Sequence, residues 1–254
     1  MILTIDIGNT TIAVGAVQKT KVLDLKRIET AVNSRHLESD LRKILNSFNK
    51  NGYKFNVAVI SSVVPILTHK VEQIIHKYAK ITVLVVGIDI VVPIKNLYKK
   101  PKQVGQDRLV GAYAALQLYG KPVIVIDLGT AITFDVVSSK GEYLGGAIVP
   151  GLRLSAESLF LKTALLPKIH IKAPRSVIGR TTEESILSGL FYGYGSLCHG
   201  FIELISRHLR AKPKVVMTGG HTHLMKKFIS PKVRIIDENL VHKGMALLVL
   251  SKKS

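Results

Sequence analysis

KPVIVIDLGTAIT, residues Lys121–Thr133, decides the fold, because an apolar run leads directly into an acidic residue, a glycine and hydroxyls. A similar stretch, MILTIDIGNTT, opens the chain at Met1–Thr11. The two carboxylates, Asp6 and Asp127, are separated by about half of the 254 residues. This repeat predicts a duplicated fold in which each half presents one carboxylate and one Gly/Thr turn to a phosphate-bearing ligand.

The composition predicts a globular chain. Of the residues, 47% are hydrophobic and 21% are charged, and at this length folding buries on the order of 70–75% of the unfolded surface. The 36 Lys and Arg against 17 Asp and Glu give a net charge of +19. Because these charges are spread and form no run of five, we expect a basic surface that attracts small anionic substrates, and no dedicated nucleic-acid site.

Nothing in the sequence predicts export or a membrane segment. The N-terminus has no basic region before its apolar run, and the run Ile81–Ile94 is interrupted by Asp89 and is too short to span a bilayer of about 30 Å. The single cysteine, Cys198, is expected to be a buried, inert thiol. We therefore expect a cytoplasmic protein.

Each half begins with three strand-like segments and continues with helices that alternate with strands. Ser34 is predicted to cap a helix that runs through Ser47. Strands that first form a meander and then alternate with helices predict an α/β fold, a mixed sheet with helices on its faces. In the first half the meander is predicted at Ile2–Ile7, Thr11–Val17 and Val22–Arg27.

The two Asp-x-Gly turns have the chemistry of a phosphate cradle. Glycine lets the backbone approach a phosphate, the hydroxyls of Thr10, Thr11 and Thr130 supply donors, and Asp6 or Asp127 holds a cation directly or through water. The sequence contains neither a Walker A motif nor a Rossmann glycine fingerprint. A single Asp-Ile-Gly hairpin would be an ordinary turn, but two copies with matching flanks favour a double cradle.

A third motif, Met217-Thr-Gly-Gly220, places a glycine pair between a strand and a helix. Together with the two turns it resembles the phosphate and adenosine motifs of the superfamily of acetate and sugar kinases, heat-shock chaperones and actin. Gly219 and Gly220 would let a purine ring lie against the backbone. By itself the pair could equally be an ordinary tight strand-to-helix turn. His221 and His223 follow it, and because no further ligand completes a zinc site, they are expected to be solvated.

Gly105-Gln-Asp-Arg108 follows an irregular basic loop and opens a helix. Asp107 could accept the proton of an acceptor hydroxyl, while Arg108 could hold a carboxylate. Alone, the pair would more often be a salt bridge at a helix start.

The motifs D-x-G-N-T, G-x-D-R, D-x-G-T and GGAIVPG occur in the order and spacing of type III pantothenate kinases, which the chain resembles over essentially its whole length. In this sequence they begin at Asp6, Gly105, Asp127 and Gly145. The resemblance implies duplicated ribonuclease H-like (actin-like ATPase) domains at 1–118 and 119–254, with the active site in the cleft between them. It also implies ATP-dependent phosphorylation of pantothenate to 4'-phosphopantothenate, the first step of coenzyme A biosynthesis.

The resemblance further implies the role of individual residues. Asp107 would be the general base, Asp127 would bind a monovalent cation (K⁺ or NH₄⁺), and Asp6 would lie on the ATP and Mg²⁺ side. The acceptor would also contact Thr182, which in family members acts across a homodimer interface. Residues implied to contact ATP are Asp6, Ile7, Gly8, Asn9, Thr10, Thr11, Ile12, Ala13 and Thr130, and those implied to contact pantothenate are Tyr98, Gly105, Gln106, Asp107 and Arg108.

The chain departs from the family pattern at two places. Gly179-Arg180-Thr181-Thr182 replaces a common Gly-x-Asn-Thr, and His242-Lys243 stands where an apolar residue often precedes Gly244. Two other functions are left open by the residues. One is a regulatory or nucleic-acid-binding relative with the same fold, suggested by the net charge, and the other is a kinase of another small hydroxyl compound.

Overall fold

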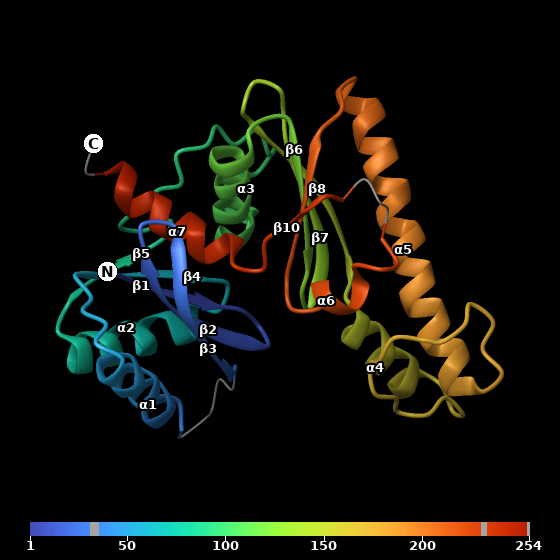
Figure 1. Cartoon of the computed structure of the whole chain (residues 1–254), viewed down its shortest axis with the longest axis horizontal. Coiled ribbons are helices and arrows are strands. Elements are labelled where there is room, and N and C mark those ends of the chain that lie inside the picture. The colour runs from blue at the N-terminus through green and yellow to red at the C-terminus, as the bar shows by residue number, and fades with distance from the viewer. Residues whose placement is uncertain (31–35, 230–232, 253–254) are drawn as a thin grey trace. The chain divides into compact units, whose positions relative to one another are not determined.

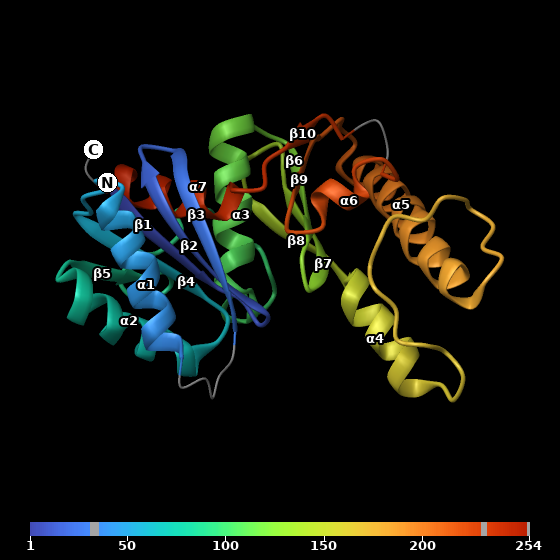
Figure 2. The same cartoon turned by 60° about the horizontal axis from the view of Figure 1, so that its bottom comes forward.

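The structure is a computed structural model that describes residues 1–30, 36–229 and 233–252. These residues form two compact units (Figures 1 and 2). The first contains Met1–Gln117 and Asn239–Ser254, and the second contains Leu118–Glu238. The predicted helix cap, Ser34, lies outside the described residues.

The first unit is built on a five-stranded mixed sheet in the order β3-β2-β1-β4-β5. The first three strands are antiparallel neighbours, whereas β4 and β5 run parallel to β1. The predicted meander is therefore confirmed. The strands are β1 (Ile2–Ile7), β2 (Thr11–Gln18), β3 (Lys21–Glu29), β4 (Val57–Ser62) and β5 (Thr82–Val85).

One face of this sheet is covered by α1 (Leu37–Lys50) and α2 (Pro65–Ala79). Helix α1 turns a buried apolar stripe to the sheet, and alternate residues of β1 pack against it. Apolar residues that recur every 3.6 residues in the helix and every second residue in the strand therefore face one another and form one core. That core includes Leu3, Ile5, Ile7, Leu41 and Phe48.

The last helix, α7 (Leu240–Ser251), packs on the strands of the first unit, chiefly on β1. Residues 239–254 therefore belong to the first unit in the structure, whereas the sequence assigned them to a second domain at 119–254. The contact includes the buried Thr4, whose Oγ1 lies 2.8 Å from Nδ1 of His242. Burial lowers the pKa of His242 to about 3, with the charge of Arg27 adding to the effect, so the imidazole is neutral in the fold.

The second unit repeats the topology of the first. Its sheet has the order β10-β9-β6-β7-β8, in which β6, β7 and β8 are antiparallel neighbours and β9 and β10 run parallel to β6. Asp6 and Asp127 each stand at the fifth position of the strand that begins the meander. This confirms the predicted duplicated α/β fold. The strands are β6 (Val123–Leu128), β7 (Ala131–Val137), β8 (Tyr143–Pro150), β9 (Lys214–Thr218) and β10 (Ile235–Ile236).

Helices α4 (Leu152–Lys162), α5 (Thr182–Leu209) and α6 (Thr222–Met225) contribute to the core of the second unit. Cys198 on α5 is fully buried, and burial raises the pKa of its thiol to about 12, which confirms the prediction of a buried, inert cysteine. No helix of the described residues is both long enough and apolar enough to cross a membrane.

Candidate active site

In the first unit, the carboxyl ends of the parallel strands β1, β4 and β5 form one edge of the sheet, which is where α/β folds place ligands. Asp6 lies next to the end of β1, and the N–H of Val63, just after β4, donates to the Ile7 carbonyl over 3.0 Å. Gly87 follows β5 with a φ of +85°. The Asp6 turn and the loops that follow β4 and β5 therefore lie together at this edge.

Helix α3 (Gln106–Tyr119) begins at the same edge. A Cβ built on Gly105 would lie 3.5 Å from Cγ1 of Val63, and one built on Gly87 would lie 2.8 Å from Cδ of Gln106. The structure thus brings the Gly105–Arg108 motif and the Asp6 turn to one edge of the same sheet. Their spacing in the sequence, about 100 residues, does not by itself show this proximity.

The carboxylate of Asp107 lies in the first turn of α3. Its Oδ1 accepts the N–H of Arg108 over 2.8 Å and would lie 2.5 Å from a Cβ on Gly105, so a larger residue at position 105 would displace this carboxylate. Gln106, Asp107 and Arg108 are all half-buried. The free N–H groups of a helix's first turn favour a negatively charged group nearby. This arrangement can hold an anionic substrate beside a carboxylate that accepts a proton.

The turn between β1 and β2 is held from the side by Thr30. Its Oγ1 donates to the Gly8 carbonyl over 2.8 Å, and its N–H donates to the Thr10 carbonyl over 2.9 Å. Asn9 and Thr10 are exposed, whereas the side chains of Ile7 and Ile12 lie in the apolar core. Of the residues expected to contact ATP, these two isoleucines can therefore present only their backbone.

The remaining site residue of the first unit, Tyr98, comes from the loop between β5 and α3. The loop contains a short 3₁₀-helix, η1 (Pro101–Gln103). Tyr98 is half-buried there, and its N–H donates to Oδ1 of Asn96 over 2.9 Å. The expected irregular connection is therefore an ordered loop that ends at the start of α3.

Ser61, at the end of β4, was not predicted to have a role. It is fully buried, and its Oγ has no hydrogen-bond partner among residues 1–30, 36–229 and 233–252. A buried polar group without a partner costs about 1–3 kcal/mol. Strand register pairs Ser61 with Asp6. The sequence offered no signal for this neighbour beyond its position at the end of a buried strand.

In the second unit, the connections that follow β8 and β9 meet at the turn that follows β6. The N–H of Gly151, after β8, donates to the Thr130 carbonyl over 3.0 Å, and that of His221, after β9, donates to the Leu128 carbonyl over 3.1 Å. Gly219 has a φ of +96°, and a Cβ there would overlap Oδ1 of Asp127. The structure therefore brings the predicted Asp127, Thr130 and Gly219–Gly220 together.

His221, like Ser61, has a position that was not predicted from the sequence. It is half-buried, and its Nδ1 lies 3.3 Å from the Leu128 carbonyl oxygen. Burial lowers the pKa of His221, and the charge of Arg153 lowers it further, while the carbonyls of Leu128 and Gly129 act in the opposite direction. His223 is exposed and pairs with Glu238 at 2.8 Å. The prediction of solvated histidines is therefore right for His223 and wrong for His221.

Thr182 begins α5 and is exposed. Its neighbour Thr181 caps the helix, since Thr181 Oγ1 accepts the N–H of Glu184 over 3.2 Å and Oε2 of Glu184 accepts the N–H of Arg180 over 2.8 Å. This arrangement resembles a capping box, except that the Glu184 carboxylate accepts the N–H of the residue before the cap and not that of the cap itself. Threonine at position 181, one of the two departures from the family pattern, thus has a structural role as a cap.

Cation binding would depend on single carboxylates. Among the described residues, no three His, Cys, Asp or Glu side chains are grouped closely enough to hold a metal ion. Magnesium is commonly bound by one or two carboxylates with phosphate oxygens and water. Asp6, beside the buried hydroxyl of Ser61, fits that pattern, and Asp127 offers one carboxylate to a second cation.

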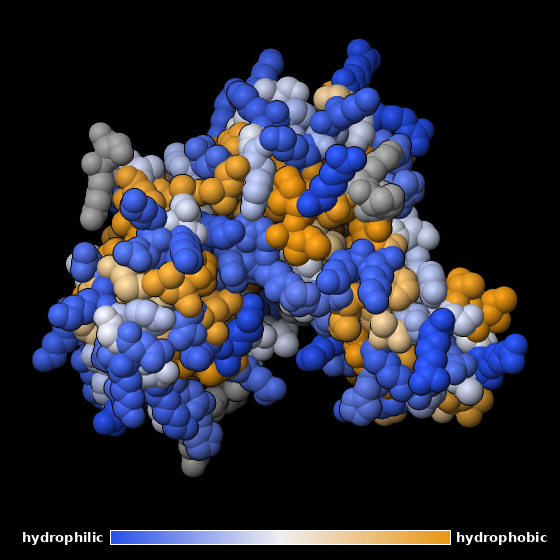
Figure 3. Space-filling view, viewed as in Figure 1, coloured by the Kyte–Doolittle hydropathy of each residue, from blue (hydrophilic) through white to orange (hydrophobic). Residues whose placement is uncertain are grey.

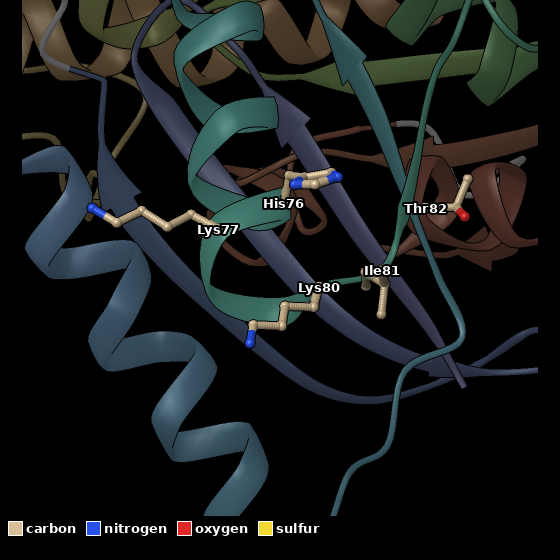
Figure 4. Close-up of a pocket in the computed structure, with 5 residues that line it drawn as sticks. All are labelled: His76, Lys77, Lys80, Ile81 and Thr82. Carbon is tan, nitrogen blue, oxygen red and sulfur yellow. The ribbon is translucent and has the colours of Figure 1, made fainter.

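A separate basic cavity is lined by His76, Lys77, Lys80, Ile81 and Thr82 (Figure 4). It lies where α2 ends and β5 begins, so it is at the opposite end of the strands from Asp6. The side chains of Lys77 and Lys80 point in different directions, and Lys77 pairs with Glu38 at 2.8 Å. Because a helix C-terminus disfavours anions, this cavity is not the candidate site.

A family model described as type III pantothenate kinase matches residues 2–204. The chain belongs to the type III pantothenate kinase family. A member from Persephonella marina is 45% identical over 238 residues, which cover 89% of this chain and 90% of that protein. The residue pattern that suggested this family is thus confirmed by similarity over nearly the whole chain.

Solved structures with the same architecture are more distant in sequence. A Baf family transcriptional activator from Campylobacter jejuni is 18% identical, with a TM-score of 0.61 over 99% of this chain and 98% of that one. A polyphosphate/ATP-glucomannokinase from Arthrobacter sp. strain KM is 15% identical, with a TM-score of 0.53 over 99% and 98% of the two chains. At these identities the likeness shows the fold alone, which is that of the sugar kinases.

Proposed function

We propose that this protein phosphorylates the primary hydroxyl of pantothenate with ATP, producing 4'-phosphopantothenate, in the first step of coenzyme A biosynthesis in the cytoplasm. Membership of the type III pantothenate kinase family supports the reaction. The observation that carries the proposal is the position of Gly105–Arg108 at the sheet edge that also holds Asp6. A motif for an anionic acceptor and a motif for phosphate thus share one edge.

In the proposed reaction, Asp107 accepts the proton of the attacking hydroxyl. Arg108 binds the carboxylate of pantothenate, since a guanidinium can form paired hydrogen bonds with it. Gly105, Gln106 and Tyr98 line the acceptor site. Little covalent chemistry is required of the protein, because phosphoryl transfer depends chiefly on position and charge.

ATP is proposed to bind through the backbone and hydroxyls of the two turns. Asn9 and Thr10 are the exposed residues that contact ATP in the first turn, and Thr130 is the exposed residue that contacts ATP in the second. Gly219 and Gly220 leave the backbone open to the purine.

Two cations would offset the charge of the phosphates. When bound, Mg²⁺ neutralises the developing charge on the phosphoryl oxygens. Asp6 would hold it on the ATP side, and Asp127 would hold K⁺ or NH₄⁺. Equal activity in potassium and sodium salts would contradict the monovalent site.

We further propose a homodimer in which Thr182 reaches the acceptor site of the neighbouring subunit. Thr182 is exposed, and apolar groups reach the surface in α4 and the loop before α5 (Figure 3). Leu161, Leu165, Val177 and Ile178 are between 60% and 91% exposed. Such a surface is typical of an interaction site. Analytical sedimentation is expected to show a dimer, and a stable, active monomer would contradict this role of Thr182.

A panel of acceptors tests the function. Purified protein with ATP, Mg²⁺ and K⁺ is expected to phosphorylate pantothenate far faster than sugars or other small hydroxyl compounds, as measured by product formation. Preference for a sugar would favour the alternative function, a kinase of another small hydroxyl compound. Sequence-selective DNA binding without kinase activity would favour the regulatory relative.

A further inference from the structure

Ser61 differs from the other hydroxyl residues around it. The neighbouring Ser62 accepts the N–H of Val64 over 3.1 Å and the hydroxyl of Thr68 over 2.7 Å. Thr4, on the adjacent strand, lies within hydrogen-bond distance of His242 and of the Gly15 carbonyl. The Oγ of Ser61 has no such partner within the part of the chain that the structure describes, although the residue is 0% exposed. An orphaned buried hydroxyl of this kind calls for an explanation.

The location of Ser61 relates it to Asp6. The two residues are partners in the parallel register of β1 and β4. Neighbouring strands lie about 4.8 Å apart, and paired residues point to the same face of the sheet. The opposite face holds the apolar core of Ile5, Ile7 and Ile60. The hydroxyl is therefore on the same face of the sheet as the Asp6 carboxylate and Thr4, on the strand next to theirs.

We propose that Ser61 is a positioning residue for the magnesium ion of ATP, and this inference rests on the proposed function in which Asp6 holds that ion. The Ser61 hydroxyl accepts a hydrogen bond from a water of the ion's shell, beside the Asp6 carboxylate. Magnesium retains several waters when it binds to a protein, so a second oxygen next to one carboxylate has a clear partner. The hydroxyl gains its hydrogen bond only when the nucleotide and its metal are bound.

An alternative is that Ser61 merely fills space in the sheet. Alanine would then serve better, because it is slightly smaller and buries no polar atom. Both explanations predict that a Ser61→Ala variant without nucleotide is as stable as the wild type or more stable. They differ in the response of the variant to magnesium, which is weaker only under our proposal.

The experiment measures melting temperature in the presence of ATP, without pantothenate, over a range of Mg²⁺ concentrations. Ligand binding stabilises the folded state by RT ln(1 + [L]/Kd), so the Mg²⁺ concentration that produces a fixed rise in melting temperature reports affinity. Ser61→Ala is expected to raise this required Mg²⁺ concentration about tenfold, since one hydrogen bond to a charged or metal-bound group is lost. Its melting temperature without nucleotide should be unchanged or higher.

Ser62→Ala is the matched control, since Ser62 is the next residue and its hydroxyl has two partners. It should lower the melting temperature without nucleotide and leave the Mg²⁺ concentration required for the fixed rise unchanged. A Ser61→Ala variant that requires the same Mg²⁺ concentration as the wild type would overturn the inference, whatever its stability. If Ser61→Ala responds to Mg²⁺ as the wild type does, and the wild type makes 4'-phosphopantothenate, only this inference fails. If the wild type makes none, the proposed function fails.

Discussion

Replacing Asp107 by asparagine should lower the turnover of pantothenate by about 10²–10⁴-fold, the usual contribution of a general base. The amide cannot accept the proton of the attacking hydroxyl. Its oxygen can still accept the N–H of Arg108, as Oδ1 of Asp107 does over 2.8 Å. The start of α3 is therefore retained. Steady-state formation of 4'-phosphopantothenate, measured against the wild type, checks the prediction.

The binding of ATP and the melting temperature of Asp107→Asn should stay close to those of the wild type, which separates loss of chemistry from loss of fold. Asp40→Asn is a suitable comparison, because Asp40 lies on α1 and pairs with the exposed Lys43 at 3.1 Å. It should keep full activity. Unimpaired turnover in Asp107→Asn would remove Asp107 from its proposed role.

Replacing Gly219 by alanine should lower the free energy of unfolding by about 2–4 kcal/mol, because it combines backbone strain with a steric overlap. The residue has a φ of +96°, and its Cβ would lie 2.6 Å from the Leu128 nitrogen and overlap Oδ1 of Asp127. The fraction of the Gly219→Ala variant that still folds should lose its activation by K⁺ relative to Na⁺, since the Asp127 carboxylate must move. Chemical denaturation and activity in the two salts measure these effects.

Gly220→Ala is the matched control for this change. No atom lies within 4 Å of a Cβ built on Gly220, so the variant should unfold with nearly the wild-type free energy. Equal stability of the two alanine variants would show that the turn after β9 does not require the conformation seen at Gly219.

Much of the fold could be predicted from local patterns. The apolar stripe of α1, the three strands of each meander and the bounds of α5 follow from hydrophobic period and turn residues. The repeat of an Asp-x-Gly turn after two similar strands predicted the duplication. The assignment of the final helix could not be predicted in this way, because an apolar helix carries no signal for which sheet it covers. Its packing on β1 places it with the first unit.

The candidate site was predicted in part. Asp6, Asp107, Arg108 and Asp127 are residue types whose chemistry is visible in short motifs. Other residues were recognisable only from their neighbours in space. His221 resembled a solvated residue at a helix start, yet it contacts the Leu128 carbonyl, which is 93 residues away in the chain.

The sequence by itself determined which segments become strands, where each strand meets a glycine turn, and which carboxylates follow, since these depend on side chains close together in the chain. Only the tertiary structure decided that Ser61 stands beside Asp6 and that Gly105–Arg108 begins at the same sheet edge. The physical reason is that strand register and helix packing join residues far apart in sequence. Local propensity does not contain that information.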